Sequence, residues 1–250
     1  MLQPSENETD FMFLPTVPAD FAKSSAHIGF VILATDRGIE NELRHIVPDG
    51  VSFHTSRAPP YSEVSSSESL ADIRRAASLM LSKEPLEAIA YACSSGSFIL
   101  DERLLIGALN FERPDVLAVT VKQAVIAAIG NNHVSKISLL TPYDRGLTAL
   151  IIASLRASGI TTVKAGFLEL KSDDEIASLS PRRILESALA LDCPQSEAIV
   201  ILCNALQTWS VVPEIAHKVG KPVIGGTQSL VEMCIRFVRR KESLLISTRS

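Results

Sequence analysis

Several features that would point to a membrane, a secreted chain or nucleic acid are absent from this sequence. No apolar run reaches the roughly 18 residues that a membrane-spanning helix needs, and residues 1–10 are acidic where a signal peptide would be basic and then apolar. Lysine and arginine are scattered, and the net charge of −4 disfavours nucleic acid as a partner. With 46% hydrophobic residues among 250, we expect one or two compact cytoplasmic domains with a substantial core.

Cysteine and glycine are also missing from the patterns in which they bind metals or nucleotides. The four cysteines form no Cys-x-x-Cys pair, and none of the five histidines stands at a metal-ligand spacing. After the first apolar run the chain reads Ile32-Leu33-Ala34-Thr35-Asp36, without the glycines of a dinucleotide-binding loop. Gly-x-Ser-x-Gly is absent as well, which excludes a serine hydrolase of that type. We therefore expect reduced thiols, no metal, no cofactor, and chemistry that comes from side chains.

What the sequence does contain is a regular alternation of strand-like and helix-like segments, which predicts a doubly wound α/β fold. Apolar runs predict strands at residues 28–34, 51–55, 88–92, 116–120, 136–140, 162–167, 198–202 and 222–224. Apolar residues at helical spacing predict helices at residues 70–81, 122–129, 147–158, 181–191, 212–219 and 229–237.

An internal repeat divides the chain. The apolar runs that end in Cys93 and Cys203 have the same phase 110 residues apart, and Asp36-Arg37-Gly38 recurs as Asp144-Arg145-Gly146 at an offset of 108. A duplicated βα unit explains both, and predicts two domains that face each other across a cleft. We expect a flexible tail over residues 1–26 and a first α/β domain over 27–120, with 225–250 packing back on it. The second α/β domain is expected over 121–224.

Cys93 and Cys203 are the main functional candidates. Both are predicted at the carboxyl ends of strands, where open α/β sheets bind ligands and where a following helix can lower a thiol's pKa. Two thiols facing one pocket can act as an acid and a base. The other interpretation is that they are inert buried thiols, which we accept for Cys193 and Cys234 because neither ends an apolar strand.

Polar residues near the two strand ends are candidate ligand contacts. Ser94 to Ser97 form either a tight turn or a set of backbone N–H groups open to a carboxylate. Asp36 and Asp144 each precede a helix-like segment, where capping is the default role and ligand binding the less common one. Tyr143 lies in a loop after a strand and is interpreted as a ligand contact.

In these residues the chain resembles the aspartate/glutamate racemase superfamily, in the branch of maleate isomerase, arylmalonate decarboxylase and the ectoine-utilisation A proteins. The resemblance covers residues 28–237. It is carried by four motifs: Ala92-Cys93-Ser94-Ser95-Gly96-Ser97; Leu140-Thr141-Pro142-Tyr143; Cys203-Asn204-Ala205-Leu206; and Gly220-Lys221-Pro222-Val223-Ile224 with Gln228. It implies two pseudo-symmetric flavodoxin-like (Rossmann-like) parallel-sheet halves with the active site between them.

For individual residues, the resemblance implies that Cys93 and Cys203 are the catalytic pair. The decarboxylase carries only the second cysteine, so the presence of Cys93 argues against decarboxylation. Substrate contacts are expected from the residues around the pair, namely Asp36, Ser94, Ser95, Thr141, Tyr143, Asp173, Asn204 and Ala205.

Departures from the family pattern narrow the expected substrate. Maleate isomerases place asparagines where this chain has Asp36 and Asp173, and the family's arginine and late asparagine are replaced by Gln207 and Thr227. Each carboxylate would repel a dianion by an energy on the order of 1 to 4 kcal/mol per pair, whereas an amino group would be attracted. The stretches around Asp36 and Asp173 look most like the ectoine-utilisation A proteins.

These observations together predict a cofactor-independent isomerase or racemase that uses the cysteine pair on a small carboxylate, with an amino-acid-type substrate as in ectoine utilisation. Maleate cis–trans isomerisation is one alternative. A two-lobed protein that binds a small carboxylate without chemistry is the other. The expected partners are this small substrate and further copies of the chain, in a dimer or tetramer.

Overall fold

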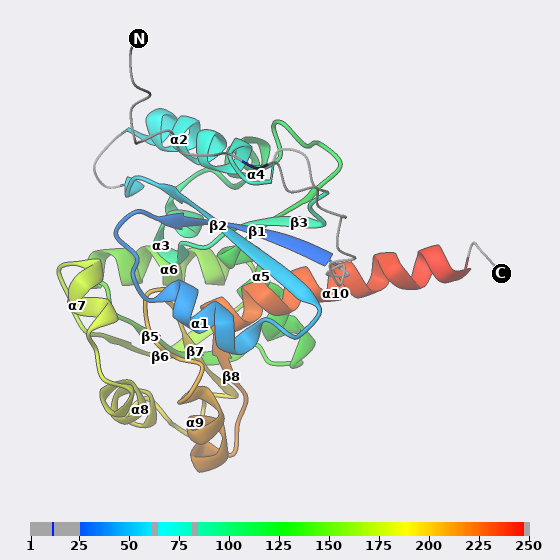
Figure 1. The fold of residues 1–250 in the computed structure, drawn as a ribbon. Coiled ribbons are helices and arrows are strands. Elements are labelled where there is room, and N and C mark those ends of the chain that lie inside the picture. Colours follow the sequence, from blue (N-terminus) through cyan, green and yellow to red (C-terminus); the bar gives the residue numbers. More distant parts are fainter. Residues whose placement is uncertain (1–11, 13–25, 62–64, 82–84, 248–250) are drawn as a thin grey trace, which may run out of the picture.

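The computed structural model describes residue 12 and residues 26–61, 65–81 and 85–247. Most of the predicted tail over residues 1–26 lies outside this part of the chain. The described residues form two four-stranded parallel sheets with helices between and around them (Figure 1). The predicted α/β class is confirmed.

The two sheets have the same topology. The first has the order β2-β1-β3-β4, built from Val51–Ala58, Ala26–Leu33, Ala88–Tyr91 and Leu117–Thr120. The second has the order β6-β5-β7-β8, built from Thr161–Phe167, Lys136–Thr141, Ala198–Ile201 and Val223–Gly225. The second order is the first with every number raised by four. The sequence repeat is therefore a repeat of the fold, and β3 and β7 are equivalent strands.

All eight predicted strands are present, with ends that differ by at most three residues. The apolar runs form strands because they are covered on both faces: every residue of β3 and of β7 is buried. β2 at the edge of its sheet is only half-buried, and it runs three residues beyond the predicted end at residue 55.

The six predicted helices are also present. They are α2 (Ser66–Ser78), α5 (Val121–Asn131), α6 (Arg145–Ala157), α8 (Pro181–Leu189), α9 (Val212–Val219) and α10 (Gly226–Ser247). Four more had no predicted bounds: α1 (Ile39–Ile46), α3 (Ser94–Ile99), α4 (Glu102–Leu109) and α7 (Asp173–Ala177). Of these, α1 follows Asp36 and α3 follows Cys93, where a helix was expected. None of the helices in the described ranges is long and apolar enough to cross a membrane.

The helices form layers around the sheets. α2 and α4 cover the outer face of the first sheet, and α8 and α9 cover the outer face of the second (Figure 1). Between the sheets lie α5 and α10, whose residues Val125 and Leu230 join Phe30 of β1 and Val200 of β7 in one buried core. This shared core holds the two halves together.

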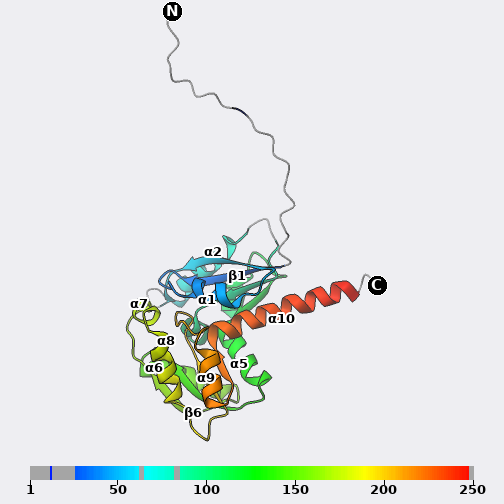
Figure 2. The ribbon, with the colours of Figure 1, turned by 60° about the horizontal axis from the view of Figure 1, so that its bottom comes forward.

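The last helix leaves the second half and crosses to the first. α10 follows β8 and packs against α5 and α1, and it also contacts β3 and β4 of the first sheet. Its far end projects beyond the rest of the fold (Figure 2). The exact division into domains at residues 120 and 224 stays a prediction.

Candidate active site

The two candidate thiols occupy equivalent places in the two halves. One residue separates each cysteine from its strand, Ala92 after β3 and Leu202 after β7, so both thiols stand at carboxyl ends of strands. In each sheet this strand lies next to the first strand of its half, at the point where the strand order changes direction across the sheet. Open parallel sheets bind ligands at such a switch point. Both thiols line one small cavity, together with Leu33, Asp36, Ala92, Ser94, Ser95, Tyr143, Asp173, Asn204 and Ala205. Its volume of about 20 Å³ gives room for about one water molecule.

Cys93 is the N-cap residue of helix α3. Its sulfur accepts a hydrogen bond from the Gly96 N–H at 3.4 Å and lies 3.4 Å from the Ser95 hydroxyl. Burial raises the pKa of the Cys93 thiol above its ordinary value, and the hydrogen bonds from Ser95, Gly96 and Tyr91 offset part of that rise. The thiol therefore already has donors in place for a thiolate.

Cys203 stands in a less favourable setting for a thiolate. Burial raises its pKa strongly, hydrogen bonds from Tyr143 and the Ala205 N–H oppose the rise, and the charges of Asp36 and Asp173 add to it. A helix was expected directly behind each thiol. This expectation is wrong for Cys203, because the next helix, α9, begins only at Val212. The intervening residues form turns, so no helix dipole supports this sulfur.

Tyr143 links the two thiols. Hydrogen bonding with Tyr143 opposes the rise in the pKa of Cys203, and Ser95, two residues after Cys93, opposes the rise in the pKa of Tyr143. Burial raises the pKa of Tyr143 well above its usual value, and the two cysteines raise it further. The phenol therefore stays protonated and remains a donor within the cavity.

Two carboxylates reach the cavity from different halves. Asp36 follows β1 and is 3% exposed, and its Oδ1 accepts hydrogen bonds from the N–H groups of Gly38 at 2.8 Å and Ile39 at 3.0 Å. Asp173 begins α7 and accepts a hydrogen bond from the Thr35 hydroxyl. Burial raises the pKa of Asp36, and the charge of Asp173 adds to that effect. The cavity is thus acidic. The N-cap residue of α1 is Gly38 and not Asp36, although Asp36 binds the N–H groups at the start of this helix.

A larger pocket of about 430 Å³ leads from the cavity to the surface. The two share Leu33, Ser95, Tyr143 and Asp173. The outer walls add Thr35, Pro60, Tyr61, Asp144, Leu147, Leu170, Lys171, Ser172 and Ile176. Among these lining residues Lys171 is the one cation, so the entrance offers an anion a single positive group.

Most of the predicted site residues come together. Both cysteines line the cavity, with Asp36, Ser94, Ser95, Tyr143, Asp173, Asn204 and Ala205. Thr141 lies apart from them: it is fully buried, and its hydroxyl pairs with that of Thr148 at 2.7 Å. The roles of all these residues stay predictions.

Sequence reasoning missed Tyr61 and Tyr91. Tyr61 follows no motif. Tyr91 stands two residues before Cys93 in a strand, and residues at that spacing share a face of the sheet, so this signal was present in the sequence.

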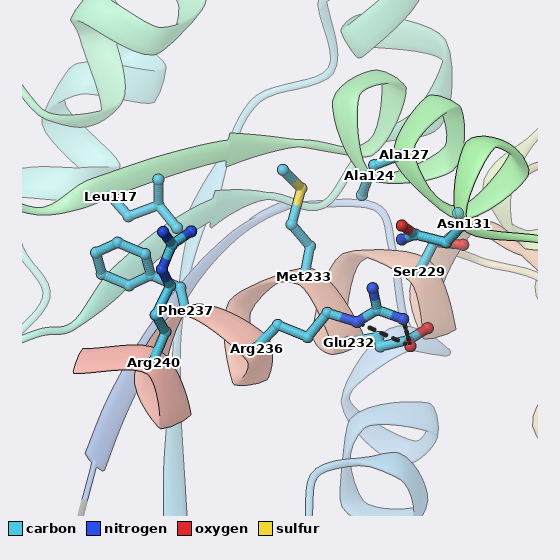
Figure 3. Close-up of a pocket in the computed structure, with 11 residues that line it drawn as sticks. Leu117, Ala124, Ala127, Asn131, Ser229, Glu232, Met233, Arg236, Phe237 and Arg240 are labelled. Atoms are coloured by element: carbon cyan, nitrogen blue, oxygen red, sulfur yellow. Dashed lines mark hydrogen bonds and ion pairs between the residues drawn. The ribbon is translucent and has the colours of Figure 1, made fainter. Parts of the chain in front are cut away.

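A second hollow, which shares no lining residue with the cavity, lies between α5 and α10 (Figure 3). It measures about 290 Å³, and Leu117, Met233 and Phe237 supply much of its apolar wall. Arg236 pairs with Glu232 at its rim. No described cysteine lines this hollow.

Comparison of the sequence with known proteins shows the family. The family model described as arylmalonate decarboxylase matches residues 62–243. The maleate isomerase of Geobacillus stearothermophilus is 27% identical over 119 residues, which is 47% of each chain, so the chain matches about half the length of this relative. The maleate isomerase of Nocardia farcinica is 24% identical over 213 residues, or 79% of this chain and 84% of that one.

Solved structures share the fold. A cysteine-to-serine mutant of the Nocardia farcinica maleate cis-trans isomerase, described with a covalently bound succinylcysteine intermediate, superposes with a TM-score of 0.76. It is 21% identical, over 86% of this chain and 93% of that one. Arylmalonate decarboxylase superposes with a TM-score of 0.71 at 16% identity, over 85% of this chain and 92% of that one.

Proposed function

Because the chain belongs to the arylmalonate decarboxylase family, we propose that it is a cofactor-independent isomerase that acts on a small carboxylate through Cys93 and Cys203. The observation that carries this proposal is the cavity that both thiols line from equivalent strand ends of the two halves. The presence of Cys93 sets the chain apart from decarboxylases that have only the second cysteine. Of the reactions open to such a pair, cis–trans isomerisation of a maleate-like enedioate is favoured by the similarity to maleate isomerases.

In this reaction the two thiols have different roles. The Cys93 thiolate adds to one alkene carbon and forms a C–S bond, while the π electrons move to the neighbouring carbon and on into its carboxylate. The former double bond is then single and can rotate. Collapse of the electron pair re-forms the double bond and expels Cys93, which yields the trans isomer. Cys203 remains protonated and can give a proton to the carbanionic carbon and take it back.

The surroundings of the two sulfurs support this division of roles. The Gly96 N–H donates a hydrogen bond to the Cys93 sulfur, and Ser95 and Tyr91 also oppose the rise in the pKa of this thiol. Cys203 faces the carboxylates of Asp36 and Asp173, which disfavour a second negative charge there. A cavity of about 20 Å³ is smaller than an enedioate, so substrate entry from the outer pocket requires the walls to move apart.

A second candidate substrate is an amino acid, as in ectoine utilisation. Asp36 and Asp173 favour it, because two carboxylates beside the thiols attract an ammonium group and repel a second carboxylate. The same cysteines would then remove the α-proton from one face and return a proton to the other.

The test is proton NMR of the full chain in D₂O with maleate and, separately, with a panel of L-amino acids including 2,4-diaminobutyrate. We expect fumarate from maleate, with at least a thousandfold loss in Cys93→Ser and in Cys203→Ser. Exchange of an amino-acid α-proton without fumarate would select the second candidate. Turnover that survives both substitutions would contradict the proposal, and saturable binding without any turnover would indicate the non-catalytic alternative.

We also propose that the protein is a homo-oligomer whose copies meet along α10. Hollows of about 290 and 430 Å³ flank this helix on its two sides, and both have apolar walls. Glu232 and Arg240 stand eight residues apart on it, so two antiparallel copies of α10 bring opposite charges together. Light scattering after size exclusion should give at least twice the chain mass of 27.0 kDa, and Phe237→Glu should lower it. A wild-type monomer would contradict this.

A further inference from the structure

The two halves differ directly beneath their thiols. Residues at i and i+2 of a strand point to the same face, so the residue two before each cysteine shares its side of the sheet. This residue is Tyr91 in the first half and Ile201 in the second, and they are 1% and 0% exposed. A hydrogen-bond donor therefore lies beneath Cys93, whereas a hydrocarbon lies beneath Cys203.

Gly96 makes room for the Tyr91 hydroxyl. A Cβ atom on Gly96 would stand 2.7 Å from the Tyr91 oxygen and 2.9 Å from Cε1 of its ring, both too close for real atoms. The phenol thus fills the space beneath the first turn of α3. The N–H of the same glycine donates to the Cys93 sulfur at 3.4 Å. The phenol, this N–H group and the sulfur therefore converge, and Leu206 occupies the equivalent place in the second half.

We propose that Tyr91 is a buried positioning residue whose hydroxyl donates a hydrogen bond to the Cys93 thiolate, and that its absence from the second half makes the two thiols unequal. The effect of Tyr91 on the reactivity of the Cys93 thiol does not depend on the proposed function. Its consequence for catalysis, that Cys93 is the thiol that attacks, rests on the proposed function.

The protonation state of Tyr91 suits this role. Burial raises its pKa well above the usual value, and Cys93 raises it further, so the phenol keeps its proton where thiols ionise. The hydrogen bond from Tyr91 lowers the pKa of Cys93. The other titratable groups around this sulfur come from five more elements: Asp36 after β1, Tyr61 after β2, Tyr143 after β5, Asp173 in α7 and Cys203 after β7.

The test uses Tyr91→Phe, which keeps the ring and removes only the hydroxyl. The rate of alkylation by iodoacetamide is followed against pH for each cysteine by peptide mass spectrometry. A hydrogen bond to a charged group is lost, so the Cys93 midpoint should rise by about one pH unit and its rate at pH 7 should fall about tenfold. Cys203 should keep its midpoint.

Tyr61→Phe is the matched control. Tyr61 also lies near Cys93, but its hydrogen bond joins Ser95 and not the sulfur, so the Cys93 midpoint should stay within a few tenths of a unit. If Tyr91→Phe fails to fold, Gly96→Ala serves instead, because its Cβ displaces the hydroxyl without deleting it.

A Cys93 midpoint that is unchanged in either folded variant, or that moves equally in Tyr61→Phe, overturns the inference. Since alkylation uses no substrate, its outcome is independent of the proposed reaction. A protein that shows the shift but converts neither maleate nor an amino acid would refute the function and leave the role of Tyr91 intact.

Discussion

The Ser94 hydroxyl donates a hydrogen bond to Oδ1 of Asn204 at 2.8 Å, across 110 residues of sequence. This is also the spacing of the two cysteines that precede them. Equivalent residues of the two halves therefore bond to each other, and both are almost fully buried. The amide of Asn204 donates in turn to the Thr227 hydroxyl at 3.1 Å. The two cysteine-bearing strand ends are thus fixed relative to each other before any substrate arrives.

Breaking this bond should destabilise the whole protein. Ser94→Ala leaves the buried Asn204 oxygen without its donor, which typically costs about 1–3 kcal/mol of unfolding free energy. Urea unfolding followed by circular dichroism measures the loss. The matched control is Ser97→Ala, because the Ser97 hydroxyl bonds only the Cys93 carbonyl within the first half, and its loss should cost less.

A double-mutant cycle tests whether the bond acts between the halves. Ser94→Ala and Asn204→Ala remove the two partners of one interaction, so the double variant should lose less than the sum of the single ones, by about 1 kcal/mol. Strict additivity would show that the two residues contribute independently.

The fold could be predicted where local sequence decides it. β3 and β7 are short runs of Ile, Val, Ala and Tyr that are buried throughout, and such runs are readable without tertiary information. α3 could not be read in this way: three of its six residues are serine and one is glycine, all with low helix propensity. It forms because Cys93 caps it and its first turn is buried. α1 has apolar residues at helical spacing and was predictable in principle.

From its own residues the site was predictable only beside the strand ends, whereas Asp173 was expected from the family resemblance. Ser94, Ser95, Asn204 and Ala205 follow the two cysteines directly, so the strand assignment placed them. Glu42 was missed because its partners Thr208 and Gln228 are 166 and 186 residues away, and no local pattern announces such contacts. Its burial is a product of the fold.

Asp36→Asn should change which substrate the cavity prefers. Asparagine keeps the Oδ1 atom that accepts from the N–H groups of Gly38 and Ile39, so the fold should be unaffected, but it removes a charge beside Cys203. Repulsion of a dianion falls by an energy on the order of 1 kcal/mol or more, so kcat/KM for maleate should rise about tenfold. The assay is fumarate formation. Adding Asp173→Asn should raise it further.

The same variants separate the two candidate substrates. If the ammonium group of an amino acid is the natural ligand of Asp36, α-proton exchange should fall at least tenfold in Asp36→Asn while maleate turnover stays negligible. A fall in maleate turnover would contradict the electrostatic argument, since the substitution removes only negative charge.

Glu42 should make stability depend on pH. It is fully buried, and it accepts hydrogen bonds from Thr208 and Gln228 that tie α1 to the Cys203 loop and α10. Burial raises its pKa from 4.5 to about 7. The folded state therefore holds a proton that the unfolded state has lost, and stability should fall as pH rises from about 4.5 to 7, by about 3 kcal/mol in total. Above this pH range the stabilising contribution of protonated Glu42 is completely lost.

Glu42→Gln isolates this contribution. Other groups also titrate, so the informative quantity is the difference in unfolding free energy between wild type and variant at pH 5, 6, 7 and 8. The unfolding free energy of wild type minus that of the variant should fall as pH rises to about 7 and then stay constant, because only the wild type loses the protonated form. Glu197→Gln is the control: this exposed carboxylate has a pKa lowered by the N–H groups of Ser135 and Lys136, so it adds no slope above pH 5. If the unfolding free energies of wild type and Glu42→Gln changed in parallel with pH, Glu42 would not be the group that titrates.

Two glycine-to-alanine substitutions should have opposite signs. In Gly96→Ala the new methyl group meets the Tyr91 hydroxyl and ring within 3 Å, and such overpacking typically costs about 1–3 kcal/mol. In Gly107→Ala the methyl group points from an exposed position of α4 into open space. Removal of glycine's backbone entropy should then stabilise the helix by about 0.5–1 kcal/mol. Thermal and urea unfolding measure both.

The double variant Gly96→Ala/Tyr91→Phe shows whether the hydroxyl is the obstacle. Removing the oxygen relieves the contact at 2.7 Å but leaves the ring carbon at 2.9 Å, so rescue should be partial. The double variant should be more stable than Gly96→Ala alone and less stable than wild type. If Tyr91→Phe gave no rescue, the ring alone would set the requirement for glycine at position 96. The Tyr91 hydroxyl would then not be the group that clashes with a side chain at position 96. Its hydrogen bond to Cys93 could still be measured by alkylation.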